Sequence, residues 1–342
     1  MVNAESKSAA FSTPTTPRFD RSALRLDAAR EVERLSSALR SAVVDDLHRR
    51  GAVIGISGGI DSSVVLALAA RALGPQRVLG VMLPEDESSP ESAELASLLA
   101  GQLGIQTLTE NISAALAGAG CYQRRDEAIR RVVPEFGPNW KSKITLPGSL
   151  LDDDTLNVFY LTAVSPAGEE IRRRIPPAEF FQIMAASNFK QRTRMAMLYY
   201  HAELHNYAVI GTANKNEHEL GFFVKHGDGG VDVALIEHLF KSQVYQLARE
   251  LNIPEEIQSR PPTSDTYSAG STQEEFFFRL PFETLDTIWY GLEHHISAET
   301  IGMALNLTAD QVERVMRDIQ KKKKTTEYLR RAPIGFGRLA AN

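Results

Sequence analysis

The chain has 342 residues, a formal net charge of -5 and an ordinary composition, with 43% apolar and 24% charged residues. This length suits one large domain or two small ones with a substantial core. The mildly negative charge argues against a general polyanion-binding surface, so we expect no nucleic acid partner. No apolar run approaches the roughly 18 to 20 residues that span a bilayer, and the N-terminus lacks an apolar signal core, so we expect no membrane partner.

Cys121 is the only cysteine of the chain. A single cysteine excludes an intramolecular disulfide and a thiolate-rich zinc site. It is best interpreted as a free structural thiol. The composition therefore predicts a reducing compartment, the cytoplasm.

The first 18 residues are rich in Ser, Thr, Ala and Pro without periodicity, and we predict that they are disordered. Residues 19–342 are predicted to form a single domain. Between residues 24 and 47 apolar residues recur at intervals of three and four, which predicts an amphipathic helix. Its apolar stripe is long enough to cover a sheet or to join a dimer surface.

The string VIGISGGIDSS at residues 53–63 predicts a buried strand, a loop and the start of a helix. Glycines leave backbone amides open to phosphate oxygens, and serine hydroxyls add donors. The residues that could cradle phosphates in this way are Ser57, Gly58, Gly59, Ser62 and Ser63. Asp61 would repel a polyphosphate unless it holds a divalent cation that the phosphates share. The alternative is a glycine turn without a ligand.

Residues 77–83 and 105–108 predict two further strands, with a helix over 91–103 between them. Strands that alternate with helices predict a doubly wound parallel sheet, in an α/β fold. Ligands gather at the carboxyl ends of such strands. Leu83, which leaves the second strand, is therefore placed to meet an adenine, although a simple strand exit explains it equally well.

Residues 120–185 are predicted to be an insertion that contains a β-hairpin, with strands over 156–164 and 170–175. Three consecutive acids, residues 152–154, precede it. Successive side chains point in different directions, so a solvated loop is favoured over a metal site.

Residues 188–205 predict a helix that begins with the string NFKQRTRM. Arg192 and Arg194 lie two residues apart and cannot share one helical face, so one of them could reach a ligand. Residues 208–211 predict a short buried strand. The polar string after it, residues 212–219, begins at the ligand side of the sheet.

Residues 221–232, GFFVKHGDGGVD, combine glycines with charged side chains, which favours a tight ligand-binding loop over an exposed turn. Residues 239–251 predict a helix with Lys241 near its start. A lysine is unfavourable at a helix N-terminus, so a phosphate partner is plausible there. Residues 261–272 read as a linker or a lid over substrate. The region from about 273 to 332 is predicted to be helical, and a helix-turn-helix in it is a minor alternative.

Ser-Gly-Gly-Ile-Asp-Ser resembles the pyrophosphate loop of ATP pyrophosphatases, and the strings together resemble the NAD synthetase family. SGGIDSS, NFKQRTRM, GTANKNEHELGFF, KHGDGGVD, HLFKSQV and PPTSD occur in the family's order. The resemblance implies an adenine nucleotide alpha hydrolase-like fold and a carbon-nitrogen ligase of the ammonia-dependent type. Such an enzyme amidates nicotinic acid adenine dinucleotide to NAD through an acyl-adenylate, using ATP and Mg²⁺ and releasing AMP and pyrophosphate.

The resemblance also implies roles for individual residues. The metal ligands are Asp61 and Glu217, which act in catalysis with Lys241. The ATP site comprises Ser57, Gly58, Gly59, Ser62, Ser63, Thr212, Lys241 and Thr263. The deamido-dinucleotide site, which lies at a homodimer interface in this family, comprises Asn188, Arg192, Lys225, Asp228 and Asp232.

Two departures from the family's pattern concern the acid substrate. The insertion is longer than compact members need, and Tyr328-Leu329-Arg330 stands where the family often has His-Lys-Arg. A related ATP-dependent amide ligase with another acid substrate is therefore the alternative function. Only about 50 residues precede the first strand, without a cysteine, so we expect free ammonia or a separate glutaminase subunit as the nitrogen source.

Overall fold

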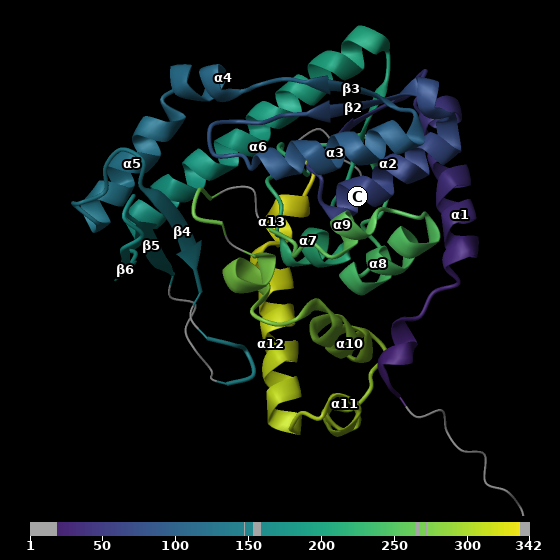
Figure 1. Ribbon diagram of the computed structural model, residues 1–342. Helices are drawn as coiled ribbons and strands as arrows, with labels where there is room; N and C mark the ends of the chain where they lie inside the picture. The colour runs from purple at the N-terminus through teal and green to yellow at the C-terminus, as the bar shows by residue number, and fades with distance from the viewer. Residues whose placement is uncertain (1–18, 147, 153–158, 264–266, 271, 336–342) are drawn as a thin grey trace, which may run out of the picture.

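The computed structural model describes residues 19–146, 148–152, 159–263, 267–270 and 272–335. The predicted disorder of residues 1–18 lies outside this part of the chain. A parallel sheet has the strand order β3-β2-β1-β7-β8, and Figure 1 shows its strands β2 and β3 in the upper part of the view. Its strands are β1 (Ala52–Gly55), β2 (Val78–Met82), β3 (Gln106–Thr109), β7 (Ala208–Gly211) and β8 (Val233–Ala234).

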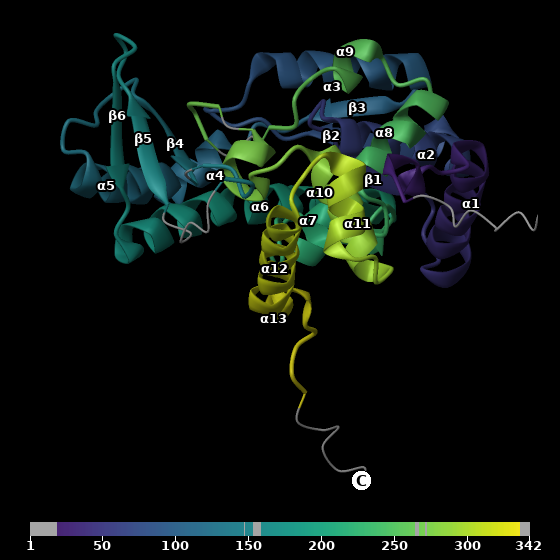
Figure 2. The same ribbon diagram turned by 90° about the horizontal axis from the view of Figure 1, so that it is seen from below.

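Helices cover both faces of this sheet, and the predicted α/β fold is confirmed. On one face, where Ile54 points, lie α1 (Ala28–Ser41), α2 (Ile60–Leu73), α3 (Pro90–Leu103) and α8 (Lys241–Glu250). On the other face, where Val53 points, lies α6 (Pro177–His205), and Figure 2 shows α3 and α6 on opposite sides of the strands. Because side chains alternate along a strand, burial of both faces requires the continuous apolar run seen in β1.

The predicted helix over residues 24–47 begins at Ala28, because the side chain of Asp27 accepts a hydrogen bond from the backbone N–H of Arg30 and caps it. The apolar stripe of α1, which includes Val32 and Leu39, is buried in the core with α2 and α8. The prediction that this stripe could serve a dimer surface is therefore wrong. It covers the sheet layer instead.

The predicted hairpin is confirmed, but it belongs to a three-stranded antiparallel sheet. This sheet has the order β4-β5-β6, from β4 (Lys141–Thr145), β5 (Tyr160–Val164) and β6 (Glu170–Arg174). Two helices that the sequence analysis missed, α4 (Ser113–Gly118) and α5 (Cys121–Val132), precede it. The sheet packs Ile144 and Leu161 against α5 and α6, and it projects from one end of the molecule (Figure 2). Of the three consecutive acids, 153 and 154 lie outside the described residues.

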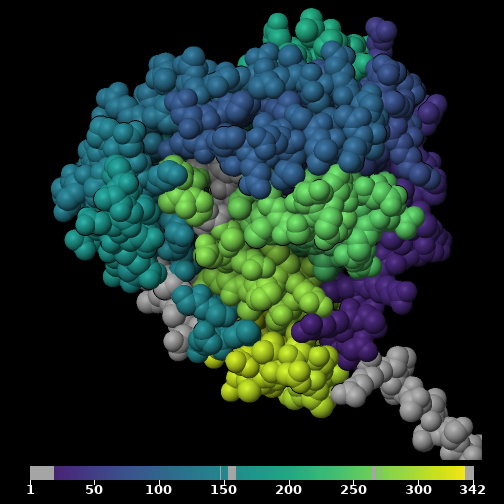
Figure 3. Space-filling view, viewed as in Figure 1, coloured from purple at the N-terminus to yellow at the C-terminus, as the bar shows by residue number. Residues whose placement is uncertain are grey.

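The C-terminal part is helical, as predicted. It contains a π-helical turn (Glu274–Phe278), α10 (Phe282–Glu293), α11 (Ala298–Leu305), α12 (Ala309–Thr325) and α13 (Glu327–Arg330), and the short helix α9 (Glu255–Gln258) precedes it. Its core surrounds the buried Trp289 and takes in Leu24 from the start of the described chain. Figure 3 shows these N-terminal and C-terminal segments side by side at one end of the molecule. Among the described residues, we find no helix with the length and apolarity that crossing a membrane requires.

Candidate active site

The glycine loop lies between β1 and α2, at the carboxyl end of the central strand. Gly58 has φ of +70°, and a Cβ atom there would lie 2.5 Å from the carbonyl oxygen of Ser92 in α3. Only glycine fits this close approach without strain. The hydroxyls of Ser62 and Ser63 donate to the carbonyl oxygen of Gly59 at 3.0 and 2.9 Å, which holds the first turn of α2 at the loop.

Two adjoining cavities lie beside this loop. We call the smaller one, of about 140 Å³, the polar cavity, because Asp61, Lys241 and Arg260 line it. We call the larger one, of about 460 Å³, the apolar cavity, because Leu83, Met184 and Phe222 are among the residues that line it. The residues that line both cavities are Ser57, Thr212, Glu217, Asp228, Thr263 and Gln273. The site therefore joins a charged compartment to an apolar one, and a single ligand could extend through both.

Asp61 and Lys241 form a buried ion pair in the polar cavity. The ammonium group of Lys241 donates to Asp61 Oδ2, and the Lys241 side chain is 1% exposed. Asn214 Nδ2 donates to the other carboxylate oxygen of Asp61 at 3.0 Å. Both oxygens of Asp61 thus have a donor, which fixes the carboxylate next to the glycine loop.

Glu217 lies in the first turn of α7 (Lys215–Leu220), where a capping box holds it. Its Oε2 accepts from the backbone N–H of Asn214 at 3.1 Å, and its own N–H donates to Asn214 Oδ1 at 3.1 Å. Gln273 Nε2 donates to Glu217 Oε1 at 3.0 Å. Asn214 therefore orients both Asp61 and Glu217.

The charges in the polar cavity depend strongly on one another. Burial, and then the nearby charge of Asp61, raise the pKa of Glu217 to about 8. Burial opposes the charged form of Lys241, but Asp61 and Glu217 outweigh it and raise the pKa of this ammonium above its usual value. Two carboxylates close enough to hinder each other's ionisation are a fitting place for a further cation.

The donor set of the polar cavity suits a hard divalent cation. Carboxylate oxygens, here those of Asp61 and Glu217, are ligands that Mg²⁺ prefers, and Mg²⁺ keeps its remaining positions for water and phosphate. Within the described ranges, no group of three or more His, Cys, Asp and Glu side chains is arranged to hold a metal ion. The protein residues alone would thus supply a partial coordination shell, which phosphate oxygens could complete.

Regions that lie far apart in the sequence build the apolar cavity. Besides the glycine loop and the exit of β7, they include the exit of β2 with Leu83, the middle of α6 with Asn188, the segment with Phe222, and the π-helical turn with Phe276. Arg194 on α6 also lines this cavity, and its Nε donates to the carbonyl oxygen of Leu83 at 3.1 Å. The volume of the apolar cavity lies within the usual range of small-molecule sites, about 300 to 1,000 Å³.

Most of the residues that the sequence analysis singled out line one of the two cavities. They are Ser57, Gly59, Asp61, Ser62, Leu83, Asn188, Thr212, Glu217, Asp228, Lys241 and Thr263. Gly58 and Ser63 support the loop from behind it. Arg192, Lys225 and Asp232 line neither cavity.

These last three residues contact protein groups. Arg192 is exposed, and its Nε donates to the carbonyl oxygen of Lys225 at 3.1 Å. Lys225 Nζ donates to the carbonyl oxygens of Tyr328 and Arg331 at 3.0 and 2.9 Å, which ties down the end of α13. Asp232 accepts from the backbone N–H of Val209 at 2.8 Å and from the hydroxyl of Tyr199 at 3.0 Å.

Three further residues contact or line the polar cavity and were not predicted from the sequence: Asn214, Arg260 and Gln273. Asn214 stands three residues before Glu217, and this capping-box spacing could have identified it. Arg260 lines the polar cavity and donates through Nη2 to Ser92 Oγ at 3.0 Å. No local pattern identifies Arg260 or Gln273, because both reach the site only through the tertiary fold.

The comparisons with known proteins identify a family. The NAD synthase family model matches residues 31–132 and 159–333. The NH(3)-dependent NAD(+) synthetase of Rhizobium meliloti (strain 1021) is 48% identical over 315 residues, which cover 92% of this chain and 94% of that protein. The enzyme of the same name from Thermotoga maritima is 35% identical over 298 residues, which cover 86% and 96%.

Solved structures share the fold. The NH3-dependent NAD synthetase from Campylobacter jejuni superposes with a TM-score of 0.58 at 22% identity, over 91% of this chain and 100% of that one. The NMN synthetase from Francisella tularensis superposes with a TM-score of 0.57 at 22% identity, over 91% and 99%. The extent of the family match and the identity to its relatives confirm the sequence-based prediction: this chain belongs to the NAD synthase family.

Proposed function

We propose that the protein amidates nicotinic acid adenine dinucleotide to NAD, with ATP and ammonia as co-substrates and with AMP and pyrophosphate as further products. The observation that carries the proposal is the charged polar cavity, with Asp61, Glu217 and Lys241, opening directly onto an apolar cavity beside the glycine loop. The polar cavity suits the phosphates of ATP, and the apolar cavity suits its adenosine. The names of the relatives give ammonia as a substrate and NAD as the product, and the acid whose amide is NAD is nicotinic acid adenine dinucleotide.

The chemistry follows from the poor reactivity of a carboxylate toward an amine. An oxygen of the substrate carboxylate attacks the α-phosphorus of ATP, the bond to the bridging oxygen breaks, and pyrophosphate leaves. Ammonia then attacks the carbonyl carbon of the acyl-adenylate, loses a proton, and expels AMP. Neither step needs a protein nucleophile, so the residues have to bind, orient and neutralise charge.

Three elements of the polar cavity serve this purpose. Backbone amides at the N-terminus of α2 face the phosphates, and the helix dipole favours negative charge there. The Lys241 ammonium remains charged, because its raised pKa keeps the proton in place at neutral pH. Asp61 and Glu217 would hold Mg²⁺, which would neutralise charge that develops on the leaving pyrophosphate.

We also propose a homodimer, formed through α6. Four of its large apolar side chains, Phe181, Phe189, Tyr200 and Leu204, are 67, 38, 57 and 63% exposed. They lie within an arc of about 140° on the helix, at 100° per residue, and this arc also carries the exposed Arg192 and Glu203. A face that combines exposed apolar side chains with charges of both signs suits an isologous contact between two copies. Size-exclusion chromatography with light scattering should give a dimer for the wild type and a monomer for Leu204→Glu.

The nitrogen source and the compartment complete the proposal. Free ammonia serves the isolated chain, and a separate glutaminase subunit could deliver it in the cell. The buried, unpaired thiol of Cys121 supports the cytoplasm as the compartment.

An assay with the purified chain tests the proposed function directly. The chain is incubated with ATP, Mg²⁺, ammonium and one acid at a time: nicotinic acid adenine dinucleotide, nicotinic acid mononucleotide or nicotinic acid. We expect NAD and AMP in equal amounts with the dinucleotide. AMP formation with another acid but not with the dinucleotide would refute the proposed substrate and leave the ligase chemistry intact. Activity with glutamine but none with ammonium would refute free ammonia as the nitrogen source.

A further inference from the structure

A buried ionic cluster lies directly behind one wall of the apolar cavity. The loop between β2 and α3 contributes Pro84, Ser88 and Ser89 to that wall. The loop carries three acidic residues, of which Asp86 is exposed. The other two, Glu85 and Glu87, do not line the cavity. Their side chains are 0 and 15% exposed, and they point into the protein behind the wall.

Lys190 binds both carboxylates. Its side chain is 1% exposed, and its Nζ donates to Glu85 Oε1 at 2.9 Å and to Glu87 Oε2. Lys190 lies on α6 between Asn188 and Gln191, which line the apolar cavity. The ammonium group thus joins two walls of this cavity, the loop after β2 and the helix α6.

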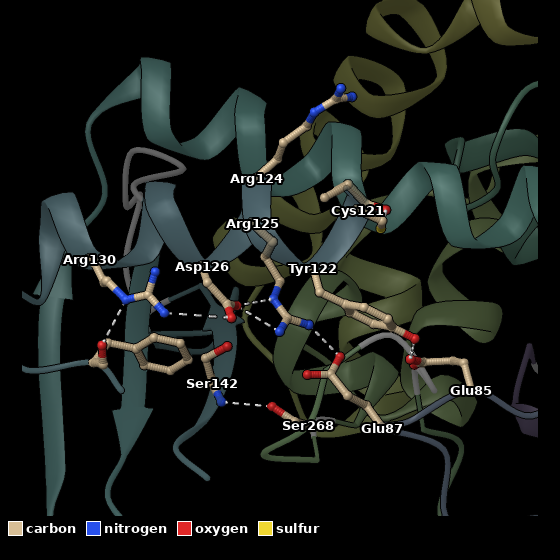
Figure 4. Close-up of polar contacts among 12 residues, drawn as sticks. Glu85, Glu87, Cys121, Tyr122, Arg124, Arg125, Asp126, Arg130, Ser142 and Ser268 are labelled. Atoms are coloured by element: carbon tan, nitrogen blue, oxygen red, sulfur yellow. Dashed lines mark hydrogen bonds and ion pairs between the residues drawn. The ribbon is translucent and has the colours of Figure 1, made fainter. Parts of the chain in front are cut away.

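The helix α5 supplies the remaining partners, as Figure 4 shows. The hydroxyl of Tyr122 donates to Glu85 Oε2 at 2.7 Å, and Arg125 Nη1 donates to Glu87 Oε2 at 2.6 Å. Tyr122 and Arg125 are three residues apart and share one face of α5. The neighbouring Arg124 points away from the cluster and is exposed (Figure 4). We call Glu85, Glu87, Tyr122, Arg125 and Lys190 the loop clamp.

The five residues of the loop clamp carry two negative and two positive charges. A further carboxylate, that of Asp126 on α5, accepts from Arg125 Nε and Nη2 at 2.9 and 2.7 Å and lies 3.9 Å from Arg130 Nη2. A buried ion pair contributes little net stability compared with apolar residues of the same volume, because desolvation offsets the attraction. What such a network can provide is one defined geometry for the segments it joins. Here the joined segments are the loop of residues 84–89, α5 and α6, and two of the three line the apolar cavity.

We propose that Tyr122, Arg125 and Lys190 are positioning residues for ATP, which act through Glu85 and Glu87 to fix residues 84–89 as the wall that receives the adenosine. The inference rests on the proposed function, in which adenosine occupies the apolar cavity. None of the three residues lines either cavity, so each acts only through the loop. This proposal gives the helix α5, which precedes β4, a role in nucleotide binding.

The test compares Arg125→Met with Arg125→Lys and with the matched control Arg124→Met, one position away on the same helix. Calorimetry measures the Kd for ATP without acid and ammonia, and steady-state assays measure kcat and both KM values. We expect Arg125→Met to raise the Kd and KM for ATP about tenfold, as indirect supports of a binding site commonly do. The kcat and the KM for the acid should change less than about twofold. Arg125→Lys should recover most of the ATP affinity, and Arg124→Met should match the wild type.

A second variant separates an effect on ATP binding from an effect on the folding of Arg125→Met. Arg125→Met with Glu87→Gln removes one charge of each sign, so Glu85 keeps Lys190 as its cation and the partly exposed Asp126 keeps Arg130. It should unfold at the wild-type temperature and still bind ATP about tenfold more weakly. Wild-type ATP affinity in Arg125→Met and in the double variant would overturn the proposed role of the loop clamp and leave the proposed function standing. A wild-type protein that binds no ATP would overturn both.

Discussion

The two cavities of the site are built in different ways. Each acidic or basic residue proposed for catalysis in the polar cavity stands in the first turn of a helix that follows a strand or a tight loop. Asp61 is the second residue of α2, Glu217 the third of α7, and Lys241 the first of α8. The apolar cavity instead takes its walls from segments as distant as Leu83 and Phe276. Short local sequence strings therefore determine where the charged groups of the polar cavity stand. The tertiary fold determines the shape of the apolar cavity.

The three helices that begin at the polar cavity, α2, α7 and α8, can all interact with one ligand. Their N-termini converge on the polar cavity, and the positive ends of their dipoles favour the phosphates of a nucleotide. The apolar cavity takes most of its lining from uncharged side chains, and contributes area and fit. We therefore expect substitutions in the polar cavity to lower the rate, and substitutions in the apolar cavity to weaken binding.

The largest effect is expected from the two carboxylates of the polar cavity. Asp61→Asn and Glu217→Gln keep the shape of each side chain and remove its charge, so each should fold and lose about 100-fold or more in kcat. The control is Glu219→Gln on the same helix, whose carboxylate pairs with Lys215 and Lys323 away from the cavities. Turnover near the wild-type rate in both cavity variants would remove the basis for a metal at this position.

An intermediate effect is expected in the apolar cavity. The ring of Phe222 lies 5.9, 5.0 and 5.5 Å from the rings of Phe276, Phe277 and Phe278, centroid to centroid. Phe222→Ala should lower the free energy of unfolding by about 2 to 3 kcal/mol and raise the KM for ATP several-fold, with little change in kcat. Met303→Ala, at a side chain that is 67% exposed, is the control. A loss confined to kcat would contradict the division between the cavities.

The last prediction concerns the pH dependence of stability and not the reaction. Because the pKa of Glu217 is raised to about 8 in the folded protein, the native state keeps a proton that the unfolded state releases above about pH 4.5. Stability should therefore fall as pH rises from about 5 to 8, by at most about 1.4 kcal/mol per pH unit from this group. Urea unfolding at pH 6 and pH 8 in metal-free buffer should show that Glu217→Gln gains stability relative to the wild type at the higher pH. An equal pH dependence in both proteins would exclude a raised pKa.

The same contrast separates what the sequence could predict from what it could not. The string at residues 53–63 predicted β1, the glycine loop and α2, because strand burial, turn and helix start all depend on near neighbours. The strand β4, Lys-Ser-Lys-Ile-Thr, has little apolar content and becomes a strand by pairing with β5. Tertiary pairing of this kind leaves no local signal.

The site residues show the same limit. Asp61, Glu217 and Lys241 could be identified because each follows a recognisable string. Lys225 belongs to an equally recognisable string, but its ammonium donates to carbonyl oxygens at the end of α13, about 100 residues further along the chain. A motif predicts which chemical group is present, and the fold decides what that group contacts.

The most direct test of the central claim follows the oxygen atoms of the substrate. Nicotinic acid adenine dinucleotide that carries ¹⁸O at both carboxylate oxygens is converted with ATP, Mg²⁺ and ammonium. The phosphorus-containing products, AMP and pyrophosphate, are analysed by mass spectrometry. If the carboxylate attacks the α-phosphorus while the polar cavity holds the leaving pyrophosphate, one ¹⁸O atom should appear in AMP and none in pyrophosphate. Unlabelled AMP alongside labelled NAD would contradict this account.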